Sequence, residues 1–218
     1  MSQIEISKRK FLQQYNPYHD EGVALKSGIN AAVQRNLLYA TTINSAQKLK
    51  VRKGWAESLL NIGKEFESDV SIAKYEQLII SLQKHMNDKY RESFNSGSQH
   101  GSMFRISHSQ KSISVYVKHL WCLNKIPEPR ICPVDRIILN QTDAVNARDI
   151  AWGYVNSIEE HRRKFSYILE EAKRSNLSVA RWELGTFLPI AQQTPRNQRP
   201  SPEDNDKRAR KPKWKNLL

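Results

Sequence analysis

FRISHSQKSISVYVKHLWCLNKIPEPRICPVDRIIL, residues 104–139, is the stretch that decides the fold of this chain. In its first half, apolar residues recur at spacings near three, four and seven, which predicts a core helix from Ser109 to Leu123. Three prolines, at positions 127, 129 and 133, then prevent the helix from continuing. Asp135 stands where an N-cap belongs, directly before an apolar run, so a second helix is predicted to begin there.

The two predicted helix starts each carry a charged residue. Lys111 would lie in the first turn of its helix, where the partial positive charge of the helix N-terminus disfavours an ammonium. A lysine whose charged form is disfavoured is a candidate nucleophile near neutral pH. The alternative is that Asp135 merely caps its helix and Lys111 is one of many solvated lysines. Each residue considered alone fits that alternative, whereas the pair suggests a more specific role.

Together these features resemble the helix-hairpin-helix base-excision DNA glycosylases. The signature of that family is a hairpin, a lysine opening a buried helix, a loop, and a Pro-Val-Asp element opening the next helix. Lys111 matches the lysine that forms a Schiff base in bifunctional members, and Asp135 matches the essential aspartate within residues 133–135. The resemblance covers about forty of the 218 residues. The 24-residue separation of Lys111 and Asp135 is somewhat longer than in the commonest members, because the connection contains extra residues.

The resemblance also implies which other residues meet DNA. The family's hairpin usually has a Gly-x-Gly core, and residues 106–109 fill that place here. The expected DNA contacts lie in and beside this hairpin and next to the aspartate: Ser107, His108, Ser109, Gln110 and Arg136. The aromatic residues expected at the base pocket are Tyr116, Trp121 and Trp152.

The activity implied by the resemblance is removal of a modified or damaged base from DNA, after the nucleotide has been extruded from the stack. Attack by Lys111 would leave a Schiff base, and elimination would add a lyase activity that cuts the strand. Oxidised purines fit the lysine-bearing branch, and a bulky modified cytosine of phage DNA, removed in antiviral defence, is a second expectation. A different class stays open, a non-catalytic helical DNA-binding protein in which Asp135 is only a cap.

The composition favours a polyanionic partner, with double-stranded DNA as the first expectation. The chain has a formal net charge of +13 and a sequence pI of about 9.8. An anionic membrane surface is the other polyanion, but the positive charge is spread through the chain rather than gathered on one amphipathic helix. No 18-residue apolar run is present, and Met1 to Leu12 lacks the apolar core of a secretory signal. We therefore expect a cytoplasmic monomer, associated with the nucleoid through DNA.

The cysteine and histidine counts argue against a metal or another cofactor. Two cysteines cannot supply the four thiolates of an iron–sulfur cluster, which excludes the cluster-bearing glycosylase branch. Six histidines show no paired metal-ligand spacing, so a zinc site is not expected either.

Helical periodicity runs through most of the chain without a competing alternating β pattern, which predicts an all-α fold. The resemblance implies a helix-hairpin-helix glycosylase-like arrangement, with two helical subdomains flanking a cleft. Residues 1–192 would form the catalytic domain, with residues 104–140 at its core, and helices should start at Ser71, Ser157 and Ser178. Residues 193–218 carry eight basic residues against three acidic ones, a net charge of +5, and are predicted to form a disordered tail that raises DNA affinity.

Overall fold

The computed structural model describes residues 1–33, 38–95, 103–144 and 147–193, and it assigns helices and no strand to them. The all-α prediction is confirmed for this part of the chain, whereas the predicted tail lies almost wholly outside it. In chain order, the elements are α1 (Gln3–Tyr15), α2 (Glu21–Val33), α3 (Ser45–Glu65), α4 (Ile72–Tyr90), η1 (Arg91–Ser93), α5 (Ile106–Cys122), α6 (Arg136–Leu139), α7 (Ala147–Ile150), α8 (Ile158–Arg174) and α9 (Val179–Gln193).

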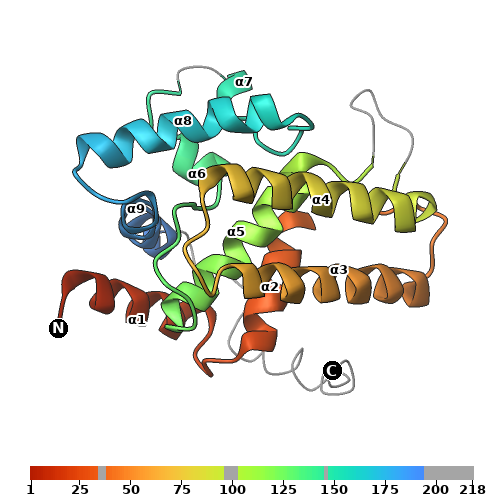
Figure 1. Cartoon of the computed structure of the whole chain (residues 1–218), viewed down its shortest axis with the longest axis horizontal. Coiled ribbons are helices and arrows are strands. Elements are labelled where there is room, and N and C mark those ends of the chain that lie inside the picture. Colours follow the sequence, from red (N-terminus) through yellow and green to blue (C-terminus); the bar gives the residue numbers. More distant parts are fainter. Residues whose placement is uncertain (34–37, 96–102, 145–146, 194–218) are drawn as a thin grey trace.

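Helix α5 lies at the centre of the molecule, with α2, α3 and α4 packed around it and α1 beside its C-terminal half (Figure 1). Every residue of α5 except Val115 is buried. Because no side of α5 faces solvent, its polar side chains must find partners within the protein. This helix therefore determines where the chain's buried polar interactions lie.

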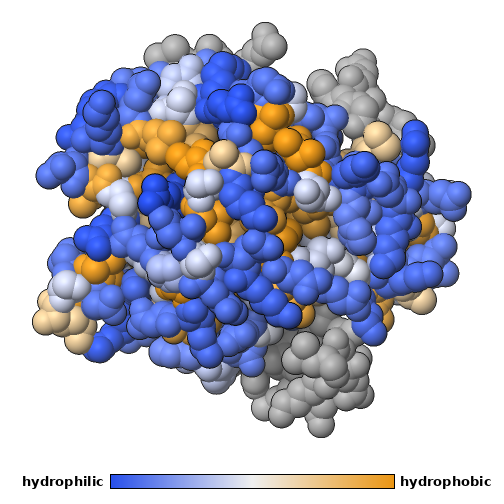
Figure 2. Space-filling view, in the orientation of Figure 1, coloured by the Kyte–Doolittle hydropathy of each residue, from blue (hydrophilic) through white to orange (hydrophobic). Residues whose placement is uncertain are grey.

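The buried hydrophobic residues form two clusters. The larger one combines residues of α1 to α5 with one face of α9. The smaller one joins α6, α8 and the other face of α9, and includes Ile138, Phe165 and Trp182. Helix α9 thus links the two clusters through its two faces. Figure 2 shows hydrophilic residues over most of one side of the molecule, with hydrophobic residues visible between α8 and α4. Within the described residues, no helix is both long and apolar enough to cross a membrane.

Three of the predicted helix starts are confirmed by side-chain caps. The hydroxyl of Ser71 accepts a hydrogen bond from the backbone N–H of Lys74 at 3.2 Å. Ser157 caps α8 in the same way at 3.1 Å, and Ser178 caps α9 at 3.3 Å. Each serine satisfies one of the backbone donors that a helix start leaves without an intrahelical partner.

The predicted start of the central helix is wrong by three residues. Helix α5 begins at Ile106, not Ser109, so residues 106–109 form its first turn rather than a hairpin. The backbone N–H of Arg105 donates to Nδ1 of His108 at 2.9 Å, and the N–H of Ser109 donates to the carbonyl of Arg105 at 3.2 Å. Lys111 consequently lies in the second turn. The effect of the helix dipole falls off within one turn, so it no longer explains an activated amine.

The close packing of α2 on α5 depends on Gly28. A Cβ at this position would lie 2.6 Å from the carbonyl oxygen of Ser112 and 3.1 Å from Cβ of Tyr116. The nearest atom belongs to the backbone of a buried helix, which cannot move aside cheaply. A side chain at position 28 would therefore force the two helices apart.

We predict that Gly28→Ala lowers the free energy of unfolding by about 1–3 kcal/mol, because it overpacks the α2–α5 contact. The matched control is Gly185→Ala in α9, where a Cβ would meet no atom within 4 Å. That substitution should be neutral or stabilise by about 0.5–1 kcal/mol through its helix propensity. Urea unfolding followed by circular dichroism measures both values. Equal effects of the two substitutions would contradict the predicted packing.

Candidate functional site

Lys111 and Asp135 meet where the start of α6 lies against α5. The ammonium of Lys111 donates to Oδ2 of Asp135, and the two side chains are only 9% and 13% exposed. The sequence suggested that both residues would belong to one site, and the fold brings them into direct contact. The pair is nevertheless an ion pair, so its resting state is an ammonium bound to a carboxylate.

Asp135 is held by two different interactions. Its Oδ1 accepts a hydrogen bond from the backbone N–H of Ile138 at 3.0 Å, which caps α6 as the sequence predicted. Burial acts to raise the pKa of Asp135, but the charge and hydrogen bond of Lys111, together with the Ile138 N–H, outweigh burial and lower it. The carboxylate is therefore ionised at neutral pH although it is largely withdrawn from water.

Gln110 fixes the segment that delivers Asp135. Its Nε2 donates to the carbonyl of Val134 at 2.9 Å, and its Oε1 accepts from the N–H of the same residue at 3.3 Å. The side-chain amide of Gln110 thus pairs with both the backbone C=O and the backbone N–H of Val134, in the way that one β-strand pairs with its neighbour. Gln110 directly precedes Lys111, and Val134 directly precedes Asp135. The two hydrogen bonds therefore fix the relative position of the two charged groups.

Trp152 completes the site from a third direction. Its ring lies 5.5 Å from Nζ of Lys111, within the range of a cation–π interaction, and the residue is half-buried. Trp152 follows the short helix α7, which ends at Ile150. Ser107 secures the next residues, since its hydroxyl donates to the carbonyl of Gly153 at 2.9 Å and its N–H to that of Val155 at 2.9 Å.

Four of the five residues expected to contact DNA are buried and act within the protein. Ser107, His108 and Ser109 have no exposed surface, and Gln110 is 2% exposed. The expectation is corrected for these four, because the turn that should have formed a hairpin is the buried first turn of α5. Burial also lowers the pKa of His108 to about 3, so the imidazole is neutral. Arg136 is exposed, at the first position of α6, and remains a candidate for phosphate contact.

Two of the three expected pocket aromatics belong to the core. Tyr116 and Trp121 are each 3% exposed and lie in the larger hydrophobic cluster. The ring of Tyr116 lies close to Gly63 of α3, and that of Trp121 lies 4.9 Å from the ammonium of Lys8. The expectation that they line a base pocket is therefore wrong, and both are packing residues of the core. Trp152 is the expected pocket aromatic that does lie beside Lys111.

The sequence did not predict Lys118 and Glu183 as a buried pair, nor the structural role of Gln110. Lys118 lies seven residues after Lys111 on α5 and forms a buried ion pair with Glu183 of α9. Two lysines seven residues apart on one predicted helix share a face, and this spacing was a usable signal. Within the described ranges, no three His, Cys, Asp or Glu side chains gather in a way that could hold a metal ion. The site therefore offers an amine, a carboxylate and an aromatic ring.

We predict that Asp135→Asn lowers the free energy of unfolding at pH 7 by about 1–3 kcal/mol, more than the loss of a cap alone. The asparagine keeps an oxygen for the N–H of Ile138 but leaves the ammonium of Lys111 without its counter-charge. Lys111→Met in the same chain should restore much of this loss, because it removes the unpaired charge.

The difference in free energy of unfolding between wild type and Asp135→Asn should become smaller as the pH falls. The pKa of Asp135 is lower in the folded state than the unfolded value of about 3.9. Its stabilisation is therefore fully present above pH 4 and is lost as the pH falls through the folded-state value. Urea titrations of wild type and Asp135→Asn between pH 7 and pH 3 measure the difference. A difference that grew on acidification would contradict the ion pair.

No family model matches this chain, and neither a curated protein nor a solved structure matches it. The resemblance to the helix-hairpin-helix glycosylases thus rests on the residues themselves. Of those residues, the structure brings Lys111, Asp135 and Trp152 together and places the expected hairpin turn and two of the expected pocket aromatics in the interior.

Proposed function

We propose that this protein is a DNA glycosylase with associated lyase activity, in which Lys111 and Asp135 act at the C1′ carbon of an extruded nucleotide. The observation that carries the proposal is the contact between these two side chains, at the start of α6 and beside the ring of Trp152. The net charge of +13 and the exposed Arg136 next to Asp135 support duplex DNA as the partner.

Cleavage of the bond between base and sugar needs three things from the protein. The nucleotide must leave the stack, because the bond is inaccessible inside the duplex. The departing base must receive a proton, and the positive charge left on the sugar must be stabilised. The ammonium of Lys111 can supply the proton, and the ionised Asp135 can stabilise the charge. Trp152 offers a ring face against which a flat base can stack.

The proposed reaction proceeds in balanced steps. The glycosidic bond breaks with its electron pair going to the base, which takes a proton from the ammonium of Lys111. The amine so formed attacks C1′ of the oxocarbenium sugar, which Asp135 stabilises as a carboxylate. The nitrogen of the new C–N bond gives up a proton, its lone pair breaks the bond between C1′ and the ring oxygen, and the ring oxygen takes up that proton as the protonated Schiff base forms. The C2′ proton then passes to water, and its electron pair expels the 3′ phosphate by β-elimination.

The proposal also includes two helical subdomains with a cleft between them. The two hydrophobic clusters would correspond to the two helical subdomains, with the cleft for the extruded nucleotide next to Lys111 and the loop of Trp152. The protein would act as a monomer on cytoplasmic, nucleoid-associated DNA. The substrate base would be an oxidised purine in repair, or a bulky modified cytosine of phage DNA in antiviral defence.

We predict that wild type releases one modified base from a panel of duplex oligonucleotides, and that borohydride traps a covalent protein–DNA adduct. Lys111→Gln should abolish trapping. Asp135→Asn should lower single-turnover base release by about two to four orders of magnitude while largely retaining DNA affinity, since it removes a negative charge. Melting temperatures measured alongside separate loss of chemistry from loss of fold.

Lys84→Gln on α4 is the matched control, because it removes an exposed lysine far along the chain from the proposed site. It should trap and excise like wild type. Tight binding of DNA by wild type with neither base release nor trapping across the panel would favour the non-catalytic DNA-binding protein. Normal excision by Asp135→Asn would reduce Asp135 to a helix cap.

A further inference from the structure

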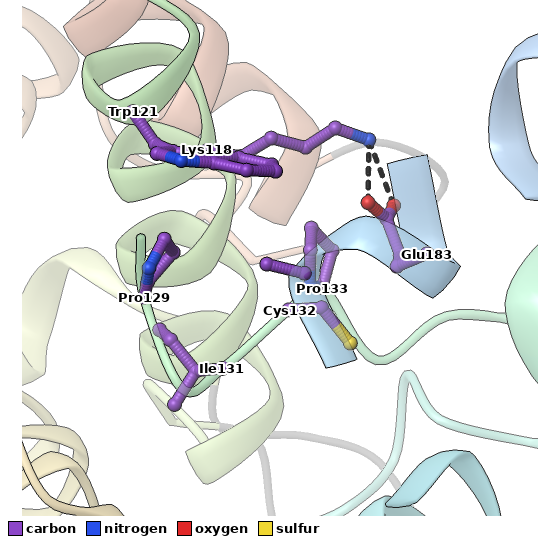
Figure 3. A pocket seen from close by; sticks show the side chains of 8 residues that line it. Lys118, Trp121, Pro129, Ile131, Cys132, Pro133 and Glu183 are labelled. Atoms are coloured by element: carbon purple, nitrogen blue, oxygen red, sulfur yellow. Dashed lines mark hydrogen bonds and ion pairs between the residues drawn. The ribbon is translucent and has the colours of Figure 1, made fainter. Parts of the chain in front are cut away.

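One buried cation of this protein has no counter-charge. Among the described residues, the buried lysine and arginine side chains are Lys8, Arg105, Lys111, Lys118 and Lys164. Each of the four lysines forms an ion pair with a carboxylate, and Figure 3 shows the pair of Lys118 and Glu183, 2.7 Å apart. Arg105 is the exception, because it is only 6% exposed and no carboxylate of the described residues pairs with it.

The guanidinium of Arg105 also lacks hydrogen bonds. Its Nε is buried without a hydrogen-bond partner within the described part of the chain, and the ring of Tyr154 lies 5.5 Å from its Cζ. Burial lowers the pKa of Arg105, yet an arginine keeps its proton in proteins. A buried charge is costly unless it is paired and hydrogen-bonded. The charge and the Nε donor of Arg105 therefore remain available to a ligand.

The backbone beside Arg105 is already occupied. Arg105 is the N-cap of α5, where the helix dipole favours an anion. The N–H of Ser107, however, donates to the carbonyl of Val155 at 2.9 Å. The N–H groups of His108 and Ser109 both donate to the carbonyl of Arg105, at 3.0 and 3.2 Å. These amides cannot bind a phosphate in the way that a hairpin would, so the side chain of Arg105 is the donor that an anion can use.

One loop lies against both Arg105 and the proposed catalytic site. Its residue Trp152 places a ring 5.5 Å from Nζ of Lys111, and its residue Tyr154 places a ring 5.5 Å from Cζ of Arg105. Lys111 follows Arg105 by six residues, which corresponds to about 9 Å along α5. A strand whose extruded nucleotide lies beside Trp152 and Lys111 would therefore bring a neighbouring phosphate towards Arg105.

We propose that Arg105 binds a phosphate of the DNA backbone next to the extruded nucleotide, and that the ring of Tyr154 covers its guanidinium in the free protein. The inference rests on the proposed function, whose DNA contact it specifies. A phosphate supplies the missing negative charge, and two of its oxygens match the fork of a guanidinium. Tyr154 is 57% exposed, so its ring can turn away without opening the hydrophobic core.

The first test measures DNA binding by full-length protein, using a duplex in which tetrahydrofuran replaces one nucleotide and leaves no glycosidic bond to cleave. Arg105→Met should weaken binding about 10- to 100-fold, because it removes charge-assisted hydrogen bonds. It should also lower the slope of log affinity against log salt by about 0.9, the value for one phosphate contact. Arg130→Met is the matched control, since Arg130 is exposed and already paired with Asp69. The control should bind like wild type.

Stability separates a binding role from a structural one. Arg105→Met should melt at the wild-type temperature or above it, because it removes a buried charge that has no partner. Arg105→Lys keeps the charge without the fork, so it should keep the salt slope while losing part of the affinity. An Arg105→Met variant that unfolds, or that binds DNA with wild-type affinity and slope, would overturn the inference.

The source of the phosphate is tested with neutral methylphosphonates, placed one at a time beside the tetrahydrofuran. One position should weaken binding by wild type and have no further effect on Arg105→Met. If no position does so, while inorganic phosphate at constant ionic strength raises the melting temperature of wild type alone, Arg105 binds a free phosphate and the assignment to DNA is wrong. These measurements do not need base release. A methylphosphonate effect without excision would therefore refute the glycosylase alone, and normal excision without that effect would refute the Arg105 contact alone.

Discussion

Burial of helix α5 together with its polar side chains is the constraint on which the rest of this structure depends. A buried polar group that finds no partner costs about 1–3 kcal/mol, so the surrounding elements must supply partners in fixed places. Trp55 donates to the hydroxyl of Ser112 at 3.1 Å, and Gln110 is matched to the backbone of Val134. The two lysines of the helix each form an ion pair, Lys111 with Asp135 and Lys118 with Glu183. Helices α3 and α9 and the α5–α6 connection supply these partners, whereas Nε2 of His108, Oγ of Ser109 and Nδ1 of His119 are buried without a hydrogen-bond partner among the described residues.

The connection from α5 to α6 shows how this constraint produces a site. It runs back along α5 past Lys118, is bound by Gln110 and then ends in Asp135 at the start of α6. Two of its prolines, Pro129 and Pro133, are buried, and they have no N–H groups to leave unpaired outside regular structure. The carboxylate that caps α6 is therefore brought to Lys111 by interactions that begin two helical turns away.

The sequence predicted those features that depend on local chemistry. The caps at Ser71, Ser157, Ser178 and Asp135 follow from short-range hydrogen bonding, and all four are found. The start of α5 was missed because residues 107–109 are polar yet wholly buried, so hydrophobic periodicity gave no signal there. The roles of those residues depend on partners distant in the chain, such as Gly153 for Ser107. Glu183 lies 65 residues from Lys118, and no spacing rule connects them.

The two ion pairs of α5 differ in a way that suits different roles. Lys111 and Asp135 lie at a helix start and keep some exposure, and the nearest aromatic ring belongs to a loop residue, Trp152. Lys118 and Glu183 lie between α5 and α9, with a ring from α1 and another from α9 against the ammonium. Opening the first pair needs movement of one short segment, whereas opening the second needs separation of packed helices. A substrate that inserts between Lys111 and Asp135 would therefore meet a site whose charges shift locally while the deeper ion pair stays in place.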